Sequence, residues 1–92
     1  METARRSIEI TNQRGLHARA SAKFVAAVSK LPDDTSVMVA KDGNEASGGS
    51  ILGLMMLGAA KGDTIEVIVT GSDAETKLTK LVGLVMDGFG ED

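Results

Sequence analysis

The order in which two hydrophobic periodicities alternate along the chain limits the fold most strongly. Apolar residues recur at every second position in three segments, which predicts strands, and an Asp-Gly-Asn turn at 42–44 adds a short fourth strand. Steps of three and four residues in two other segments predict helices, and an apolar run bracketed by glycines predicts a short helix between them. The predicted strands span 7–11, 35–41, 45–47 and 64–71, and the predicted helices span 18–29, part of 48–63, and the segment between Asp73 and 87–90. This order folds most simply as an antiparallel sheet with helices on one face, and 92 residues suit one domain over residues 1–92.

Two of the predicted helices have a clear apolar face. That of the first helix comprises Ala18, Ala22, Val25 and Val28, with Phe24 at its edge. That of the last helix comprises Leu78, Leu81, Val82 and Val85. Asp73 is the predicted N-cap of the last helix, because aspartate is a favoured capping residue.

Composition excludes several classes of function. Only Phe24 and Phe89 are aromatic and the net charge is -3, so a nucleic-acid partner is not expected. The chain has no cysteine, which excludes disulfides and thiolate chemistry and is typical of a reducing compartment. The opening residues lack the apolar region of a secretory signal, and no apolar run approaches the ~20 residues that span a bilayer. We therefore expect a cytoplasmic protein with no membrane partner.

The only histidine, His17, lies between a Gly-Leu pair and the first turn of a predicted helix. Backbone N–H groups at a helix N-terminus have no intrahelical partner, and the helix dipole makes that end partly positive. Arg19, two residues later, can bind phosphoryl oxygens through two hydrogen bonds. A phosphoryl group on a ring nitrogen of His17 would therefore be stabilised from two directions.

Other roles for His17 remain open from the residues alone. The commonest is a helix cap or a surface histidine without catalytic function. A metal site would need more ligands than one histidine with no cysteine and no evident carboxylate arrangement, so we predict no metal and no cofactor. Ser21 lacks the separate base and orienting group of a hydrolytic triad. A histidine that accepts a group and passes it to a partner protein is the remaining chemistry.

Two segments, GLHARASAKFV (15–25) and GGSILGLMMLGAAKGDTIEVIVTGSD (48–73), closely resemble HPr, the histidine-containing phosphocarrier family of the phosphoenolpyruvate-dependent phosphotransferase system. The resemblance extends over nearly the whole chain. It implies an α+β fold, an open-faced β-sandwich whose four-stranded antiparallel sheet is covered on one face by three helices. It also implies that His17 takes a phosphoryl group at Nδ1 from phosphorylated enzyme I and passes it to an enzyme IIA, assisted by Arg19. Such a protein is a monomeric carrier rather than a stand-alone enzyme.

Ser50 lies just before the predicted short helix, where serine is a favoured N-cap. The resemblance implies a second role, as the regulatory site that an HPr kinase/phosphorylase modifies. A two-turn helix cannot bury all of its apolar residues, so part of the set should be exposed beside His17. The resemblance favours a docking patch for enzyme I and enzyme IIA that comprises Ile51, Leu52 and Met55. The alternative is that the methionines pack around a core formed by Leu54 and Leu57.

The chain departs from the family pattern in two respects. Ala20 stands where the motif commonly has proline, and alanine should keep the helix and add a free N–H group. Positions that are often basic in relatives are occupied by Ala26, Ser29, Gly49 and Gly53. The rival function is a non-catalytic regulatory binding module of the same fold, which would be free to lose His17 and Arg19. The residues do not distinguish the sugar branch of the system from the nitrogen-related branch.

Overall fold

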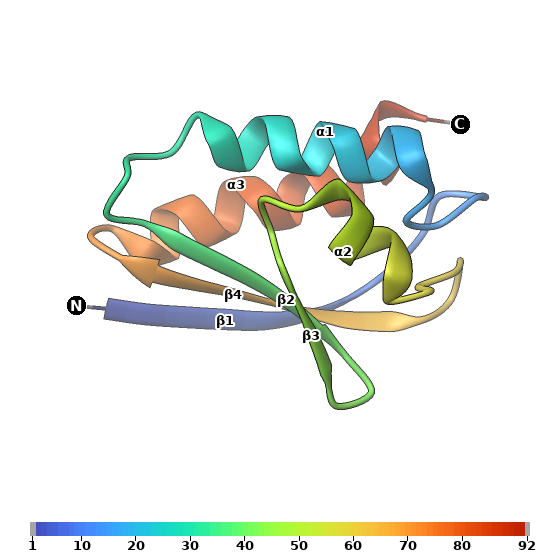
Figure 1. The fold of residues 1–92 in the computed structure, drawn as a ribbon, viewed down its shortest axis with the longest axis horizontal. Helices are drawn as coiled ribbons and strands as arrows, with labels where there is room; N and C mark the ends of the chain where they lie inside the picture. The colour runs from blue at the N-terminus through green and yellow to red at the C-terminus, as the bar shows by residue number, and fades with distance from the viewer. Residues whose placement is uncertain (1, 92) are drawn as a thin grey trace.

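The computed structural model describes residues 2–91 as a four-stranded antiparallel sheet with its helices on one face (Figure 1). The strands are β1 (Glu2–Glu9), β2 (Ser36–Lys41), β3 (Asn44–Ser47) and β4 (Thr64–Gly71), in the spatial order β1-β4-β2-β3. The helices are α1 (Ala18–Ser29), α2 (Ile51–Met56) and α3 (Ala74–Met86), followed by the 3-10 turn η1 (Gly88–Gly90). The predicted open-faced α+β sandwich is confirmed.

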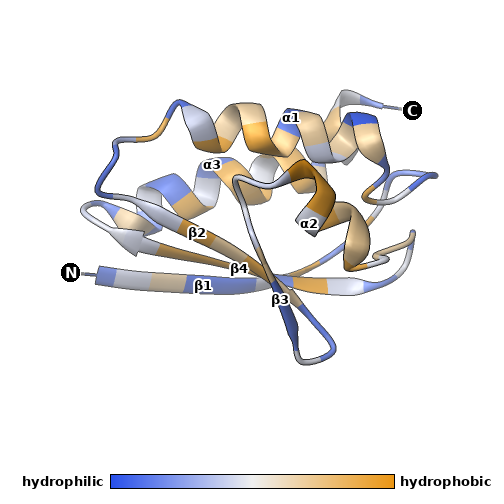
Figure 2. Cartoon of the chain, in the orientation of Figure 1, coloured by the Kyte–Doolittle hydropathy of each residue, from blue (hydrophilic) through white to orange (hydrophobic). Residues whose placement is uncertain are grey.

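The core lies between the helices and one face of the sheet. Ile65, Val67 and Val69 of β4 alternate toward the helices and are almost fully buried. They are paired in register with apolar residues of the neighbouring strands, such as Ile8 with Ile65 and Val39 with Val67. The predicted inner face of α3 is confirmed, since it buries Leu78, Leu81, Val82 and Val85. Figure 2 shows this apolar band along the middle of the sheet beneath the helices.

The first strand is longer than predicted and ends two residues earlier. β1 pairs with β4 from Glu2 to Glu9, although Ile8 is its only buried residue. β1 lies at the edge of the sheet and is held there by backbone hydrogen bonds to β4. Such bonds do not require alternating apolar side chains, so the first half of β1 has no apolar pattern in the sequence. Ile10, which the pattern assigned to the strand, is fully buried in the loop that follows.

The bounds of α1 are as predicted, and its predicted apolar face is only partly correct, because Val25 and Val28 pack against the edge of the core but are not the residues that the helix buries most deeply. The helix buries Ala20, Ser21 and Phe24, whereas Ala18 is exposed. The ring of Phe24 therefore lies in the core and not at its edge. The apolar residues of this helix are alanine, valine and phenylalanine only, and phenylalanine, the largest of them, gains most free energy from burial.

Asp73 is the N-cap residue of α3, as predicted, but its side chain does not cap the helix. It has a left-handed backbone with φ of 53° and makes no side-chain capping bond. A capping side chain requires an extended backbone, which directs its oxygen toward the helix N–H groups. The Ala74 N–H donates instead to Oε1 of Glu2, at 3.3 Å. Within residues 2–91, no helix is long and apolar enough to cross a membrane.

Candidate functional site

The site forms around His17, which caps the N-terminus of α1. Its backbone is extended, with φ of -75° and ψ of -178°, and its Nδ1 accepts a hydrogen bond from the Arg19 N–H at 3.3 Å. The carbonyl of His17 accepts the first helical bond from the Ser21 N–H, at 2.9 Å. The imidazole thus has a ring nitrogen directed at the free N–H groups of the first turn, as the sequence position predicted.

The two residues before His17 fix where its ring lies. Leu16 is buried, and its N–H donates to the carbonyl of Ala59 at 2.9 Å. Gly15 has a φ of +63°, and a Cβ at this position would lie 2.3 Å from the same carbonyl oxygen. Glycine is therefore required at position 15 by conformation and by space, so that the chain can pass against the segment after α2.

The other ring nitrogen is bonded to a residue from the far end of the chain. Nε2 of His17 lies 2.8 Å from Oε2 of Glu91, and both side chains are only 16% exposed. Figure 1 shows the C-terminal segment beside the start of α1. The chain turns back after α3 through Gly88, Phe89 and Gly90, all of which have positive φ. Glu91 was not predicted from the sequence, because it lies 74 positions from His17 and no local pattern connects the two residues.

Asn12 connects the loop before His17 with the C-terminal segment. Its Nδ2 donates to the Gly15 carbonyl at 2.8 Å and to Oε1 of Glu91 at 3.1 Å, and its side chain is fully enclosed. Burial acts to raise the pKa of Glu91, but hydrogen bonds from Asn12 and His17 and the charges of His17 and Lys23 outweigh it, so this pKa lies below its ordinary value. Glu91 therefore remains an anion.

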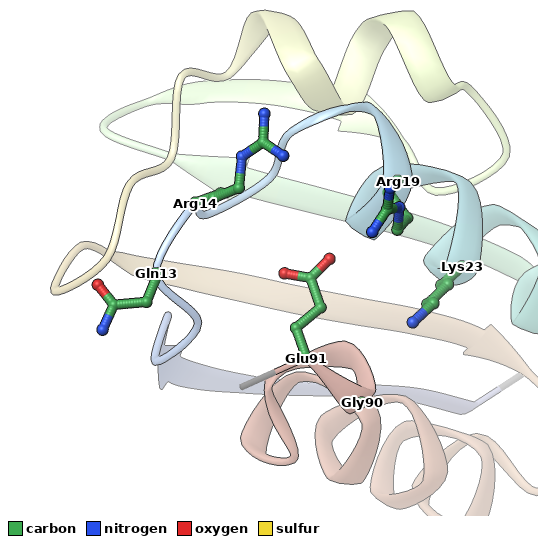
Figure 3. A pocket seen from close by; sticks show the side chains of 6 residues that line it. All are labelled: Gln13, Arg14, Arg19, Lys23, Gly90 and Glu91. Carbon is green, nitrogen blue, oxygen red and sulfur yellow. The ribbon is translucent and has the colours of Figure 1, made fainter.

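An open pocket of about 390 Å³ adjoins this cluster, as Figure 3 shows. Its lining residues are Gln13, Arg14, Arg19, Lys23, Gly90 and Glu91. The carboxylate of Glu91 points into the space between Arg14 on one side and Arg19 and Lys23 on the other. Among residues 2–91, neither arginine forms an ion pair, so both guanidinium groups are available to an incoming anion. Arg19 was predicted here, and Arg14 and Lys23 were not.

Helix α2 presents an apolar surface and packs beside α1. Its predicted cap is present, since the Ser50 hydroxyl accepts a hydrogen bond from the Gly53 N–H at 2.9 Å. Leu54 is fully buried and Leu57 is half-buried. The exposed fractions are 41% for Ile51, 67% for Leu52, 39% for Met55 and 77% for Met56. Part of the apolar set of α2 is therefore exposed, as expected, and Met56 in particular does not pack into the core.

The arrangement suits attack by a ring nitrogen on an electrophile that carries negative charge. Nδ1 has a lone pair, because it accepts a hydrogen bond, and it faces unpaired N–H groups of the helix. Three cations line the adjoining pocket. Within residues 2–91 there is no cluster of three metal-ligating side chains, and this imidazole is already bonded at both nitrogens.

Comparisons with known proteins agree with this chemistry. The model of the family described as "PTS HPr component phosphorylation site" matches residues 4–87. The phosphocarrier protein HPr of Neisseria meningitidis is 45% identical over 87 residues, covering 95% of this chain and 96% of that protein. The phosphocarrier protein NPr of Escherichia coli K12 is 38% identical over 91 residues, covering 98% and 99%. The crystal structure of HPr-C-His from Thermoanaerobacter tengcongensis superposes with a TM-score of 0.86 at 37% identity, covering 100% and 99%.

Proposed function

Since the chain belongs to the HPr/NPr family of phosphocarriers of the phosphotransferase system, we propose that His17 carries the phosphoryl group, taking it from phosphorylated enzyme I and giving it to an enzyme IIA. The single observation that supports this assignment best is the bonding of the two ring nitrogens. Nδ1 accepts only a long bond of 3.3 Å from the Arg19 N–H, whereas Nε2 is held at 2.8 Å by Glu91. Nδ1 is thus the nitrogen that can exchange its weak bond for a bond to phosphorus.

The transfer step needs no further nucleophile. The lone pair of Nδ1 attacks phosphorus, the N–P bond of the donor phosphohistidine breaks, and its electron pair stays on the donor ring. The phosphoryl oxygens then lie near the unpaired N–H groups at the start of α1 and near the guanidinium group of Arg19. Arg14 and Lys23 add positive charge to the same pocket. The protein acts as a monomer that shuttles between its partners.

The docking surface that we propose consists of Ile51, Leu52 and Met55 on α2. Exposed apolar groups of this size commonly mark a partner surface, and α2 lies next to the helix that His17 caps. One partner at a time, enzyme I or enzyme IIA, would cover this patch. Ser50 borders it, so modification by an HPr kinase/phosphorylase would add charge at its edge.

Replacement of His17 by alanine tests the proposal. We expect His17→Ala to abolish the uptake of label from phosphoenolpyruvate and enzyme I, because no second histidine is present. The wild-type adduct should be acid-labile, as phosphoramidates are. Far-UV circular dichroism serves as the control for folding.

Acid-stable label, or label that persists in the alanine variant, would contradict the assignment of His17. A folded wild-type protein that takes no label at all would instead be the non-catalytic regulatory binding module.

A further inference from the structure

We propose that a pocket between the end of α1 and the first half of α3 is the docking site for an acidic segment of a partner protein. The segment places one apolar side chain on the floor of the pocket and carboxylates against the three lysines around it. This lysine pocket has a volume of about 270 Å³ and is lined by Ala27, Lys30, Leu31, Lys77, Lys80 and Leu81. It is separate from the pocket beside His17, so the inference does not depend on the function proposed for His17.

The cations of the chain differ in whether they have a carboxylate partner. Three of the ten lysine and arginine residues form ion pairs with a carboxylate, namely Arg5, Arg6 and Lys41. Among residues 2–91 the other seven form none, and six of these line two pockets, three in the pocket beside His17 and three in the lysine pocket. The chain has 13 acidic residues, yet none that the structure describes lines the lysine pocket. Its positive charge is therefore available to a ligand.

Lys77 is held in place by neutral groups. Its Nζ donates to Oγ1 of Thr35, at 2.9 Å, and to the carbonyl of Ser72. An ammonium group has three donors, so one remains for an incoming anion. The Thr35 hydroxyl donates to Oδ1 of Asp34 at 3.2 Å, and Oδ2 of Asp34 accepts from the Ser72 hydroxyl at 3.4 Å. Asp34 is thus connected to Lys77 only through hydroxyl groups and forms no ion pair with it.

The floor of the lysine pocket is apolar. Leu81 is 2% exposed and belongs to the core, whereas Ala27 and Leu31 are half-buried and pack against the core. Lys30 and Lys80 are exposed, and their flexible side chains can follow a bound anion. A simple inorganic anion would make no use of the floor. A ligand that uses both parts of the pocket has an apolar group with negative charges beside it.

The size and charge of the lysine pocket favour a protein segment over other ligands. Pockets for small molecules commonly have volumes of ~300–1,000 Å³ and enclose most of the ligand. The lysine pocket is smaller, and three residues form its floor, which suits a single apolar side chain. Nucleic acids and anionic membranes are bound by extended basic surfaces, whereas this chain has a net charge of -3.

The lysine pocket lies at the other end of α1 from His17. Lys30 is the C-cap residue of α1 and His17 is its N-cap residue, and a helix of 12 residues is about 18 Å long. Figure 1 shows the end of α1 beside the start of α3, on the side of the molecule opposite the start of α1. Neither His17 nor the exposed residues of α2 line the lysine pocket. A segment bound there would therefore leave the place of the phosphoryl group open.

The test titrates the ¹⁵N-labelled protein with the peptide acetyl-Glu-Glu-Leu-Glu-Glu-amide and follows the backbone amide shifts by NMR. The control peptide has serine in place of leucine, so it has the same charge without the apolar group. Lys80→Glu tests the lysines, and Lys61→Glu is the matched control, because Lys61 is an exposed lysine outside the pocket. Lys77 is left unchanged, since its bonds hold Thr35 and Ser72.

We expect the leucine peptide to cause saturable shifts of the amides of Ala27, Leu31 and Leu81. The serine peptide should bind there about fivefold more weakly or worse, because it leaves the apolar floor in water. Lys80→Glu should raise the Kd of the leucine peptide by about threefold or more, since one exposed ion pair is lost and a like charge replaces it. Lys61→Glu should leave this Kd unchanged.

The proposal would be overturned if these amides did not shift with the leucine peptide. Equal affinities for the two peptides, or equal losses in Lys80→Glu and Lys61→Glu, would also overturn it, because unspecific attraction between charges would then explain the binding. Saturation of the same amides by inorganic phosphate at lower concentrations than by the peptide would assign the pocket to a small anion instead. Sedimentation with phosphatidylglycerol vesicles that Lys80→Glu abolishes would assign it to a membrane surface.

Discussion

Ser50 offers a perturbation in which helix stability and partner docking can be separated. Its hydroxyl accepts from the Gly53 N–H at 2.9 Å and caps a helix of only 6 residues. The same side chain borders the exposed apolar patch of Ile51, Leu52 and Met55. Ser50→Ala removes the cap but adds no charge, whereas Ser50→Asp keeps a capping oxygen and adds a negative charge.

The expected changes in stability follow from the capping geometry. Loss of an N-cap serine costs about 1 kcal/mol, which lowers the Tm of a domain of this size by about 4–8 °C. Aspartate is as good an N-cap as serine, and its charge at a helix N-terminus contributes about 0.3–1 kcal/mol in the favourable direction. We therefore expect Ser50→Ala to be less stable than the wild type, and Ser50→Asp to be at least as stable.

The expected changes in docking have the opposite order. A carboxylate at the edge of a buried apolar contact loses water without gaining a partner, which costs about 1–3 kcal/mol. A cost of about 1.4 kcal/mol corresponds to a tenfold rise in the KM for phosphorylation by enzyme I. Ser50→Ala leaves the patch uncharged, so its KM should equal that of the wild type.

Thermal unfolding and steady-state phosphorylation by enzyme I together test both orders. If the Tm of Ser50→Asp were as low as that of Ser50→Ala, the capping argument would fail. If Ser50→Asp had the KM of the wild type, Ser50 would have no role at the docking surface and would be only a helix cap.

Two further predictions concern the surroundings of the imidazole. Arg19→Glu should slow phosphoryl transfer, measured by quenched flow, by about 10–100-fold, which corresponds to the loss of one charged hydrogen bond. Lys30→Glu makes the same charge change at the other end of α1 and should leave the rate unchanged. Equal rates for the two variants would refute the role of Arg19. Gly15→Ala should lower the Tm more than Gly43→Ala. Both glycines have positive φ, but only at position 15 would the new Cβ meet the Ala59 carbonyl, at 2.3 Å, so equal losses would show that this close approach is unimportant.

The sequence by itself determined the features whose causes are local. The order of strands and helices follows from apolar spacing, and the bounds of α1 and β4 were predicted correctly. The caps at His17 and Ser50 were predictable because a capping bond joins residues two or three positions apart. The exposed face of α2 was predictable because so short a helix has one inner side.

Only the tertiary structure decided the features that depend on distant segments. The first half of β1 is a strand because β4 supplies its hydrogen bonds, and the rotation of α1 depends on which side chain best fills the core. The contact between His17 and Glu91 joins residues 74 positions apart, so no local periodicity encodes it. It depends on where α3 ends and on a left-handed turn that burial of Phe89 stabilises. Packing of the whole chain thus sets the chemical environment of the imidazole, while local sequence sets its place at the helix end.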